Sequence, residues 1–439
     1  MNQLLQPKQK VKTVTSNMDC EVEKFLGGGG QGEVYRADLN GAKVALKWYY
    51  PAQATENQKT ALEALIKKGS PSDRFLWPID LTTSKDIPAF GYIMGLREPQ
   101  HKNIVDLMKG RTNPTFFALA TTGMQLAHNF LLLHSNGLCY CDISFGNVFF
   151  DPITGDILIC DNDNVGIDGL APISVLGTPR FMAPEIVRRE ALPSTRTDLF
   201  SLSVLLFYMM MIHHPLEGAR EASIKCLDAP AMNKLYGTEP LFIFDPDDDS
   251  NHPIKGYHDN ALTYWNIYPT FLKNLFIQSF TQGIRDPING RVRESEWRKA
   301  MVRLRDSIII CQHCGSENFY DEEVLKNSGK LNSCWQCRKD FQIPPRIRID
   351  KRIVMLNSNT KLYPHHVDRD KRYDFSTPVA EIARHPQNPN IWGLRNISSE
   401  KWNTTGKDGL LKDIEPGKSV TLTNETKINF GKAEGEIRS

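Results

Sequence analysis

Five glycines stand close together near the start of the sequence, at Gly27, Gly28, Gly29, Gly30 and Gly32. Without a Cβ atom, glycine lets backbone amides approach a phosphate group closely. The spacing G-x-G-x-x-G-x-V, which runs from Gly27 to Val34, is typical of a loop that covers phosphates. The segment therefore predicts a phosphate-binding loop, with a flexible hairpin tip as the alternative.

A lysine follows this loop at a distance that suits the same chemistry. The turn Asn40-Gly41 separates two strand-like runs, and the second run ends in V-A-L-K at Lys47. A single lysine in a strand is usually a solvated edge residue. Behind a glycine-rich loop, however, we expect Lys47 to neutralise nucleotide phosphates, and Val34 and Ala45 to contact the nucleotide.

Three oxygen-bearing side chains further along could handle a proton and a metal ion. Asp142 and Asn147 stand in the spacing D-x-x-x-x-N, and Asp161 directly follows the strand-like run Ile157–Cys160. In phosphoryl transfer, one carboxylate orients the substrate hydroxyl, while an amide oxygen and a second carboxylate hold Mg²⁺. The spacing assigns the first role to Asp142 and a metal-ligand role to Asn147. This stretch resembles the catalytic loop of protein kinases, and the resemblance implies a metal-binding aspartate after the next strand. We favour Asp161 for it because it lies directly at the strand end, with Asp163 as the alternative. A turn rich in Asp and Asn is the competing interpretation.

These residues need strands first and helices afterwards to position them. Turn residues and alternation predict strands up to Met94, with one intervening helix that ends at Gly69. Helical periodicity dominates from Phe116 to about Arg305. The expected fold class is α+β, with a small β-rich lobe and a larger helical lobe. The expected boundaries are a disordered N-terminus at 1–20, a first lobe at 21–97 and a second lobe at 98–307.

Three later motifs complete the pattern. Gly177–Glu185 reads GTPRFMAPE, Thr197–Leu202 places an aspartate before an apolar helix, and Arg291 precedes Trp297. Together and in this order, the motifs resemble those of the eukaryotic-like Ser/Thr protein kinases found in bacteria. The resemblance covers roughly residues 22–305.

The resemblance implies a two-lobed protein kinase fold and the use of ATP and Mg²⁺. It also implies transfer of a phosphoryl group to a Ser or Thr hydroxyl of a protein substrate. Asp142 and Lys47 would then be catalytic, and the glycine-rich loop would cover ATP. By the same resemblance, Asp198 would anchor the catalytic loop, and Arg291 would pair with Glu185.

Several positions depart from the family's pattern. Tyr140 and Cys141 replace the usual His-Arg before the catalytic aspartate, and Ser144 replaces a lysine, so two positive charges are missing. The helical partner of the nucleotide-binding lysine stays open among three residues, which are Gln58, Glu56 and Glu63. An ATP-binding pseudokinase that scaffolds partner proteins is therefore the rival hypothesis.

Four of the nine cysteines form two C-x-x-C pairs separated by 19 residues, namely Cys311, Cys314, Cys334 and Cys337. This is the ligand spacing of a zinc ribbon, in which four thiolates make a closed structural site. We expect the ribbon at residues 308–343. Buried free thiols or a redox pair are the alternative.

The last segment, 346–439, predicts short strands separated by turns, as in a β-sandwich. The strand around Leu394, the turn Glu415–Lys418 and the strand Ile428–Gly431 resemble a divergent forkhead-associated (FHA-like) domain, a phosphothreonine-binding sandwich. The family's serine and histidine are not found, and Arg384 would have to replace its phosphate-binding arginine. A packing or dimerisation module is the alternative.

Charge and hydropathy exclude other classes. The formal net charge of the 439 residues is only +2, so no global charge favours nucleic acid or an anionic membrane. The longest apolar stretch, Leu199–Ile212, is too short to span a bilayer, and the N-terminus lacks the apolar core of a secretory signal. We therefore expect a cytoplasmic protein without membrane or nucleic-acid partners.

The order of kinase, zinc ribbon and sandwich resembles kinases that are encoded beside a PP2C-like phosphatase and a von Willebrand A protein. Such kinases belong to bacterial tellurium-resistance and stress systems. The resemblance implies these two proteins as partners and a signalling role.

Overall fold

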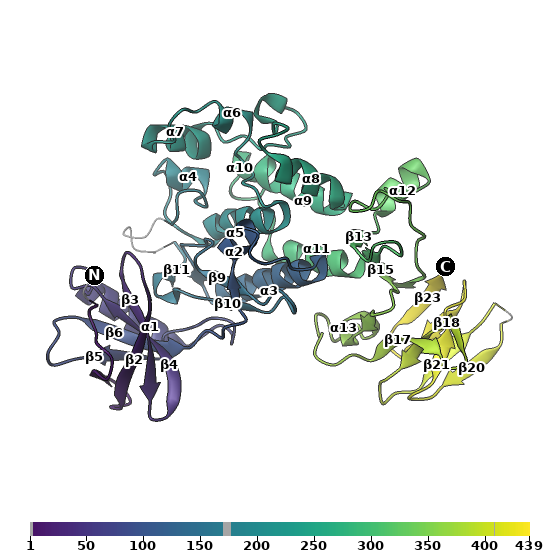
Figure 1. Ribbon diagram of the computed structural model, residues 1–439, viewed down its shortest axis with the longest axis horizontal. Helices are drawn as coiled ribbons and strands as arrows, with labels where there is room; N and C mark the ends of the chain where they lie inside the picture. The colour runs from purple at the N-terminus through teal and green to yellow at the C-terminus, as the bar shows by residue number, and fades with distance from the viewer. Residues whose placement is uncertain (1–2, 170–176, 408) are drawn as a thin grey trace. The chain divides into compact units, whose positions relative to one another are not determined.

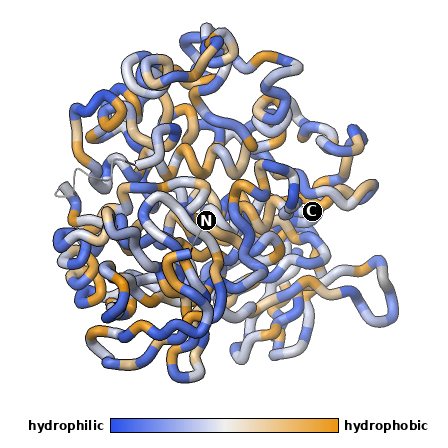
Figure 2. The backbone as a smooth tube through the Cα atoms, turned by 60° about the vertical axis from the view of Figure 1, so that its left-hand side comes forward, coloured by the Kyte–Doolittle hydropathy of each residue, from blue (hydrophilic) through white to orange (hydrophobic). Residues whose placement is uncertain are grey.

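The computed structural model describes residues 3–169, 177–407 and 409–439, and the chain divides into two compact units (Figure 1). The first unit runs up to Trp265 and includes Asn274–Lys299, and the second contains Asn266–Lys273 and Ala300–Ser439. Along the backbone, hydrophobic and hydrophilic residues alternate at short intervals (Figure 2). This pattern is typical of elements that bury one face.

A closed barrel begins the first unit, with its six strands in the order β1-β2-β3-β4-β6-β5. The strands are β1 Lys10–Thr13, β2 Asp19–Gly28, β3 Gly32–Leu39, β4 Ala42–Tyr49, β5 Asp80–Thr83 and β6 Phe90–Gly95. Successive side chains of a strand point to opposite faces. In β4, Leu46 and Trp48 therefore join one hydrophobic cluster, and Ala45 and Tyr49 join another. Lys47 shares the second face, which is the one that meets the candidate site.

Helix α1 (Glu56–Lys68) follows the barrel strand β4. The side chain of Thr55 caps its first turn by accepting a hydrogen bond from the backbone N–H of Gln58 at 3.2 Å. Leu62 and Leu65 are its buried residues, and Gly69 ends it in a backbone conformation with φ 81° that glycine adopts readily. The helix predicted to end at Gly69 is thus present, and Gly69 caps its end.

The prediction of a disordered N-terminus over 1–20 is wrong for the residues that the structure describes. Strand β1 pairs with both β2 and β5 and closes the barrel. Leu5 and Val11 are buried, and the backbone N–H of Leu4 donates to the Glu33 carboxylate at 2.8 Å. Both apolar residues stand in a mostly polar segment of the sequence. The pairing with β5 also joins residues about seventy positions apart.

Helices dominate the chain from Ile104 to Asp306. They are α2 Ile104–Met108, α3 Phe116–Ser135, α4 Pro184–Val187, α5 Thr195–Met211, α6 Ala219–Ala222, α7 Ala229–Asn233, α8 Asp259–Ile267, α9 Thr270–Phe280, α10 Gln282–Arg285 and α11 Glu294–Asp306. Short strands hold the loops between them, namely β7 Lys102–Asn103, β8 Leu138–Cys139, β9 Val148–Phe150, β10 Ile157–Ile159 and β11 Gly166–Ile167.

Two of these helices form the centre of the helical part. Helix α3 is long and apolar enough to cross a membrane, but 72% of its most apolar window is buried inside the protein, as in a core helix. Helix α5 is buried around almost its whole circumference. A capping box between Ser194 and Thr197 starts α5 and places Asp198 in its first turn.

A buried hydrogen-bonded chain links α3, α5 and the start of α11. One ring nitrogen of His134 lies 3.2 Å from the Asp198 carboxylate, and the other contacts the Glu294 carboxylate. Burial alone would lower the pKa of His134, but these two acceptors raise it to about 9. The imidazole is therefore cationic at neutral pH and compensates two buried carboxylates.

Beyond Asp306, the second unit contains a hairpin, two short helices and two antiparallel sheets. The hairpin pairs β12 Ile308–Ile310 with β13 Glu317–Phe319, and α12 Glu322–Ser328 follows. One sheet has the order β15-β14-β23-β22-β19-β20, and the other has the order β16-β17-β18-β21. Residues of both sheets, including Ile347, Leu394 and Ile428, form one hydrophobic core.

The bounds of these strands complete the description of the second unit. The first sheet consists of β14 Arg346–Ile349, β15 Arg352–Met355, β19 Trp402–Thr405, β20 Leu411–Ile414, β22 Lys427–Asn429 and β23 Glu434–Arg438. The second consists of β16 Lys361–Leu362, β17 Ala380–His385, β18 Asn388–Asn396 and β21 Ser419–Thr421, and the helix α13 Pro364–Val367 lies between β16 and β17 in sequence.

The raised pKa of His134 predicts how stability depends on pH. A group whose pKa is raised by folding stabilises the folded state fully below its unfolded pKa, ordinarily 6.5, and loses that effect as pH rises through about 9. His134→Gln should therefore lower the free energy of unfolding at pH 6, and the difference from the wild type should shrink above pH 9. Chemical denaturation across this pH range measures the difference.

His128→Gln is the matched control for this prediction. His128 lies on the same helix, but burial lowers its pKa. For this control, the difference in free energy of unfolding from the wild type should not shrink above pH 9. A difference for His134→Gln that stays constant from pH 6 to pH 10 would contradict the cationic assignment.

Candidate active site

A cavity of about 930 Å³ lies in the first unit, lined by the glycine-rich segment, β4, the residues after β6 and the loop around Asp142. Its apolar lining includes Leu26, Val34, Ala45, Met94, Leu96 and Phe149. Its polar lining includes Lys47, Asp142, Asp161, Asn164 and Thr178. An apolar wall that ends in converging charged groups suits a ligand with a flat apolar part and an anionic part.

The glycine-rich segment forms the end of β2 and the turn into β3, and all five of its glycines line the cavity. A Cβ atom at Gly32 would lie 2.2 Å from the Trp48 carbonyl oxygen, so only glycine lets β3 approach β4 here. At Gly27, Gly29 and Gly30, by contrast, a Cβ atom would meet nothing within 4 Å. Their backbone is therefore open to a ligand in the cavity.

Lys47 reaches the cavity from β4 and is itself buried. Its ammonium group lies 2.8 Å and 3.0 Å from the two carboxylate oxygens of Asp163, 3.0 Å from Gln31 Oε1 and 3.5 Å from Asp161 Oδ1. Burial by itself lowers the pKa of Lys47, but Asp163 and Asp161 outweigh it and raise the pKa above its ordinary value. The lysine is therefore held as a cation.

The two aspartates after β10 face different surroundings. Asp161 adopts a left-handed backbone conformation with φ 50°, and its side chain is 41% exposed and lines the cavity. The Asp163 side chain has no exposed surface. A strained backbone at a non-glycine residue is often found at functional sites, and here it directs one carboxylate into the cavity and the other onto Lys47.

Asp142, on the loop between β8 and β9, also lines the cavity. Its carboxylate accepts a hydrogen bond from the Thr178 hydroxyl at 2.8 Å and one from Asn147 Nδ2 at 3.3 Å. Asn147 Nδ2 also donates to the backbone carbonyl of Asp142 at 2.8 Å. Among the described residues, neither Asn147 nor Asp163 belongs to the cavity lining, so Asn147 lies behind Asp142.

Asp198 of helix α5 fixes the loop that carries Asp142. The Asp198 carboxylate accepts the backbone N–H of Tyr140 at 2.5 Å and that of Cys141 at 3.2 Å. Cys141 has φ 69° and is buried beside Cys139, so no cation stands at this position. The contact between Asp198 and the loop, which the sequence motif predicted, is present in the structure.

A second ion pair stabilises the segment that ends in Ala-Pro-Glu. Arg291 lies 2.7 Å from the Glu185 carboxylate and also donates to the Arg196 carbonyl at 2.8 Å. The predicted pairing of Arg291 with Glu185 is therefore confirmed. The preceding residues 170–176 lie outside the described part of the chain.

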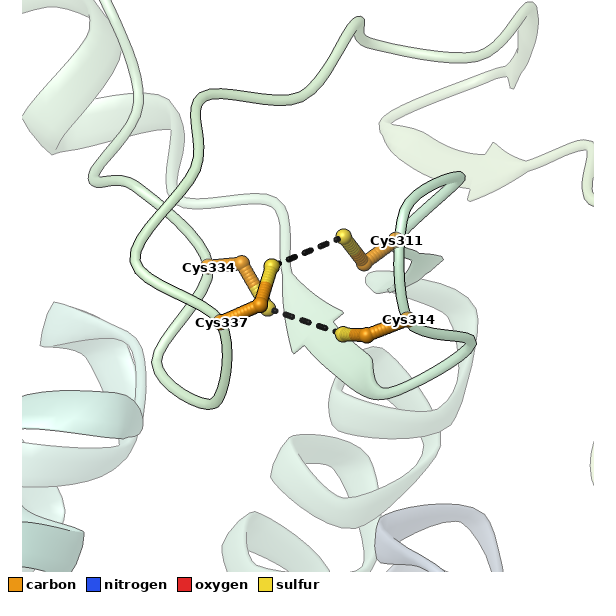
Figure 3. A group of neighbouring side chains, drawn as sticks. All are labelled: Cys311, Cys314, Cys334 and Cys337. Carbon is orange, nitrogen blue, oxygen red and sulfur yellow. Dashed lines mark hydrogen bonds between the residues drawn. The ribbon is translucent and has the colours of Figure 1, made fainter.

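Four cysteines of the second unit form a separate cluster. The sulfur atoms of Cys311, Cys314, Cys334 and Cys337 all lie within 4.8 Å of one another, and Figure 3 shows the thiols pointing towards a common centre. The Cys311–Cys337 and Cys314–Cys334 sulfur separations are 3.8 Å and 3.7 Å. A disulfide would require about 2.05 Å, whereas four sulfurs at about 2.3 Å from a tetrahedral metal stand about 3.8 Å apart. The cluster is thus compatible with zinc.

Sequence reasoning missed several residues of the site. It left Gln58, Glu56 and Glu63 open as partners of Lys47, whereas Asp163 makes that contact and both glutamates are exposed. No sequence pattern singled out Gln31, which stands among the glycines, or Tyr49, which stands two residues after Lys47.

Comparison with known proteins identifies the first unit. Residues 20–256, more than half of the chain, match the family described as protein kinase domain. Protein kinase YegI of Escherichia coli (strain K12) is 23% identical over 321 residues, which are 69% of this chain and 48% of that protein.

Plant kinases are similar over a shorter range. CBL-interacting protein kinase 29 of Oryza sativa subsp. japonica is 25% identical over 213 residues, 45% of this chain and 47% of that protein. CBL-interacting serine/threonine-protein kinase 15 of Arabidopsis thaliana is 27% identical over 208 residues, 44% of this chain and 47% of that protein. The chain spans about half the length of these relatives. The two-lobed fold predicted from the motifs is supported, and the chain belongs to the protein kinase domain family.

Proposed function

We propose that this chain is a serine/threonine protein kinase that transfers the γ-phosphoryl group of ATP to a hydroxyl of a protein substrate. The observation that carries the proposal is the convergence of Lys47, Asp142 and Asp161 on one cavity beneath the glycine-rich segment. The names of the similar kinases support a Ser or Thr hydroxyl as the acceptor.

Each residue has a role that its surroundings support. The open backbone at Gly27, Gly29 and Gly30 covers the phosphates, and the Lys47 ammonium neutralises their charge. Asp142 orients the substrate hydroxyl and accepts its proton, since its carboxylate lines the cavity. The remaining nucleotide contacts proposed from the sequence, Gly28, Gly32, Val34 and Ala45, also line the cavity.

The oxygen donors beside the cavity fit Mg²⁺, which prefers carboxylate and carbonyl ligands. Asp161 presents a partly exposed carboxylate to the cavity. Asn147 uses its amide nitrogen towards Asp142, which leaves the amide oxygen for the metal. When bound, Mg²⁺ would neutralise charge on the phosphate oxygens.

Two substitutions indicate how activity is controlled. The arginine that docks an activation-loop phosphate in the family is replaced by buried Cys141, and a lysine near the transferred group is replaced by Ser144. We therefore propose that activation does not depend on a phosphate docked at position 141. The same losses motivate the alternative of a pseudokinase scaffold, which the following measurement separates from the enzyme.

Asp142→Asn should lower the rate of phosphoryl transfer by roughly 10²- to 10⁴-fold, because the general base is lost while nucleotide binding remains. The measurement is transfer of labelled phosphate from ATP/Mg²⁺ to the protein itself and to generic substrates, with mass-spectrometric mapping of modified hydroxyls. Asp86→Asn, the same change in an exposed loop, is the control and should keep wild-type rates. A wild type that binds ATP but transfers no more phosphate than Asp142→Asn would favour the scaffold.

We also propose that the four-cysteine cluster holds a structural Zn²⁺. Protein purified without chelator should contain about one zinc per chain. Cys334→Ser should lose the metal and lower the melting temperature by more than about 5 °C, because metal binding stabilises the folded site. Cys226→Ser removes an exposed cysteine outside the cluster and should change neither value. Less than half an equivalent of zinc in the wild type would contradict the proposal.

The two sheets of the second unit support an FHA-like domain that binds phosphothreonine. The Arg384 guanidinium, proposed to bind the phosphate, lies 4.5 Å from the Trp392 ring centre and is thereby held at the β17–β18 hairpin. A module for packing or dimerisation is the alternative. Such a domain is also consistent with a cytoplasmic role in bacterial stress signalling, with a PP2C-like phosphatase and a von Willebrand A protein as proposed partners.

Phosphothreonine peptides should bind the full chain, and Arg384→Ala should weaken this binding at least about 10-fold, because a charge-assisted contact to phosphate is lost. Fluorescence anisotropy with a degenerate phosphothreonine peptide library measures the affinity. The unphosphorylated library is the control. Equal binding of both libraries would contradict the FHA-like assignment.

A further inference from the structure

Asp163 is a buried carboxylate that the proposed catalytic roles leave unused. Both of its carboxylate oxygens accept hydrogen bonds from Lys47, at 3.0 Å and 2.8 Å, and one also accepts the Tyr49 hydroxyl. Lys47 and Asp163 are 116 residues apart in the sequence. The pair therefore ties the barrel strand β4 to the turn that follows β10.

Helix α1 supplies an amide here instead of a carboxylate. Gln58 Nε2 lies 3.3 Å from the Asp163 backbone carbonyl and 3.3 Å from the Tyr49 hydroxyl. Glu56 and Glu63, the acidic residues of α1, are both exposed. Within the described residues, the carboxylates that lie within 4 Å of the Lys47 ammonium group are those of Asp161 and Asp163.

Asp163 is enclosed in the way expected for the partner of a buried cation. A metal ligand would instead need a carboxylate oxygen that is open to the cavity. A buried carboxylate is tolerated when a cation and further donors satisfy its oxygens, and removing one partner leaves an uncompensated charge. Lys47 and Tyr49 satisfy Asp163 in this way, and burial and Asp163 raise the pKa of Tyr49, so its hydroxyl keeps the proton that it donates. Asp161, two residues earlier, is open to the cavity.

We propose that Asp163 is the residue that positions Lys47 for the nucleotide phosphates, in place of a carboxylate from helix α1, and that Tyr49 and Gln58 hold Asp163 in place. This rests on the proposed function, because it assumes that Lys47 contacts nucleotide phosphates. The metal ligand Asp161 and the lysine partner Asp163 then belong to one short turn. A displacement of that turn would withdraw both at once, whereas a rotation of α1 would not break the ion pair directly.

A double-mutant cycle on nucleotide affinity tests the assignment. The variants are Lys47→Met, Asp163→Asn and their combination, and the probe is a non-hydrolysable ATP analogue measured by calorimetry. Asp163→Asn should weaken binding by roughly 10- to 100-fold, since a misplaced lysine loses its phosphate contact. In the Lys47→Met background the same change should weaken binding by less than about 3-fold, because residues that act as a unit are not additive. An equal factor in both backgrounds would overturn the proposal.

The dependence on Mg²⁺ separates a lysine partner from a metal ligand. Asp161→Asn should raise the Mg²⁺ concentration for half-maximal nucleotide binding at least about 10-fold, and Asp163→Asn should change it less than about 2-fold. A shift for Asp163→Asn as large as that for Asp161→Asn would overturn the proposal.

Circular dichroism and thermal melting show whether each variant folds. If Asp163→Asn does not fold, Tyr49→Phe replaces it in the cycle, since that change removes one hydrogen bond to Asp163 and keeps the packing of the ring. Its effect on nucleotide affinity should likewise disappear in the Lys47→Met background, and persistence there would count against the assignment.

Binding of the ATP analogue and transfer of phosphate are measured separately, so the kinase activity and the role of Asp163 are tested independently. A wild type that binds the analogue but transfers no phosphate rejects the kinase activity, and the cycle still decides the role of Asp163. A wild type that transfers phosphate but shows an additive cycle rejects the role of Asp163 alone.

Discussion

A buried ion pair between Lys47 and Asp163 joins strand β4 to the turn after β10, and its two residues are 116 positions apart in the sequence. Its geometry depends on the β4 alternation that places Lys47 on the face lining the cavity, and on the left-handed turn at Asp161 that buries Asp163. A buried ion pair persists only when its remaining hydrogen-bonding groups are satisfied. Tyr49 and Gln58 supply those contacts, so this corner of the cavity is organised before any ligand enters.

A second buried carboxylate organises the loop that carries Asp142. Asp198 fixes the backbone of the loop that carries Asp142, and cationic His134 balances its charge. Both arrangements therefore use a buried acid that holds part of the cavity lining through hydrogen bonds. A cation compensates each acid, namely Lys47 itself in the first case and His134 in the second. Gly32 adds a steric condition, since its missing side chain lets β3 lie close to β4 and sets the position of the glycine-rich segment.

Much of the site could be predicted from the sequence, because its motifs are local. Gly27–Gly32, Lys47 and Asp142 each belong to a short pattern with its own turn or strand, and the cysteine spacing fixes the four-thiol cluster. The partner of Lys47 could not be predicted, because which of two nearby aspartates is buried depends on one backbone angle at Asp161. The strand β1 was missed for a related reason, since its partner β5 is distant in the sequence.

A crystal structure of the chain with Mg²⁺ and a non-hydrolysable ATP analogue tests whether Asp163 positions Lys47. The Lys47 ammonium group should contact phosphate oxygens while it stays hydrogen-bonded to Asp163, and Asp161 should coordinate the metal. Coordination of the metal by Asp163, with Lys47 paired instead to a carboxylate of helix α1, would rule out this role of Asp163.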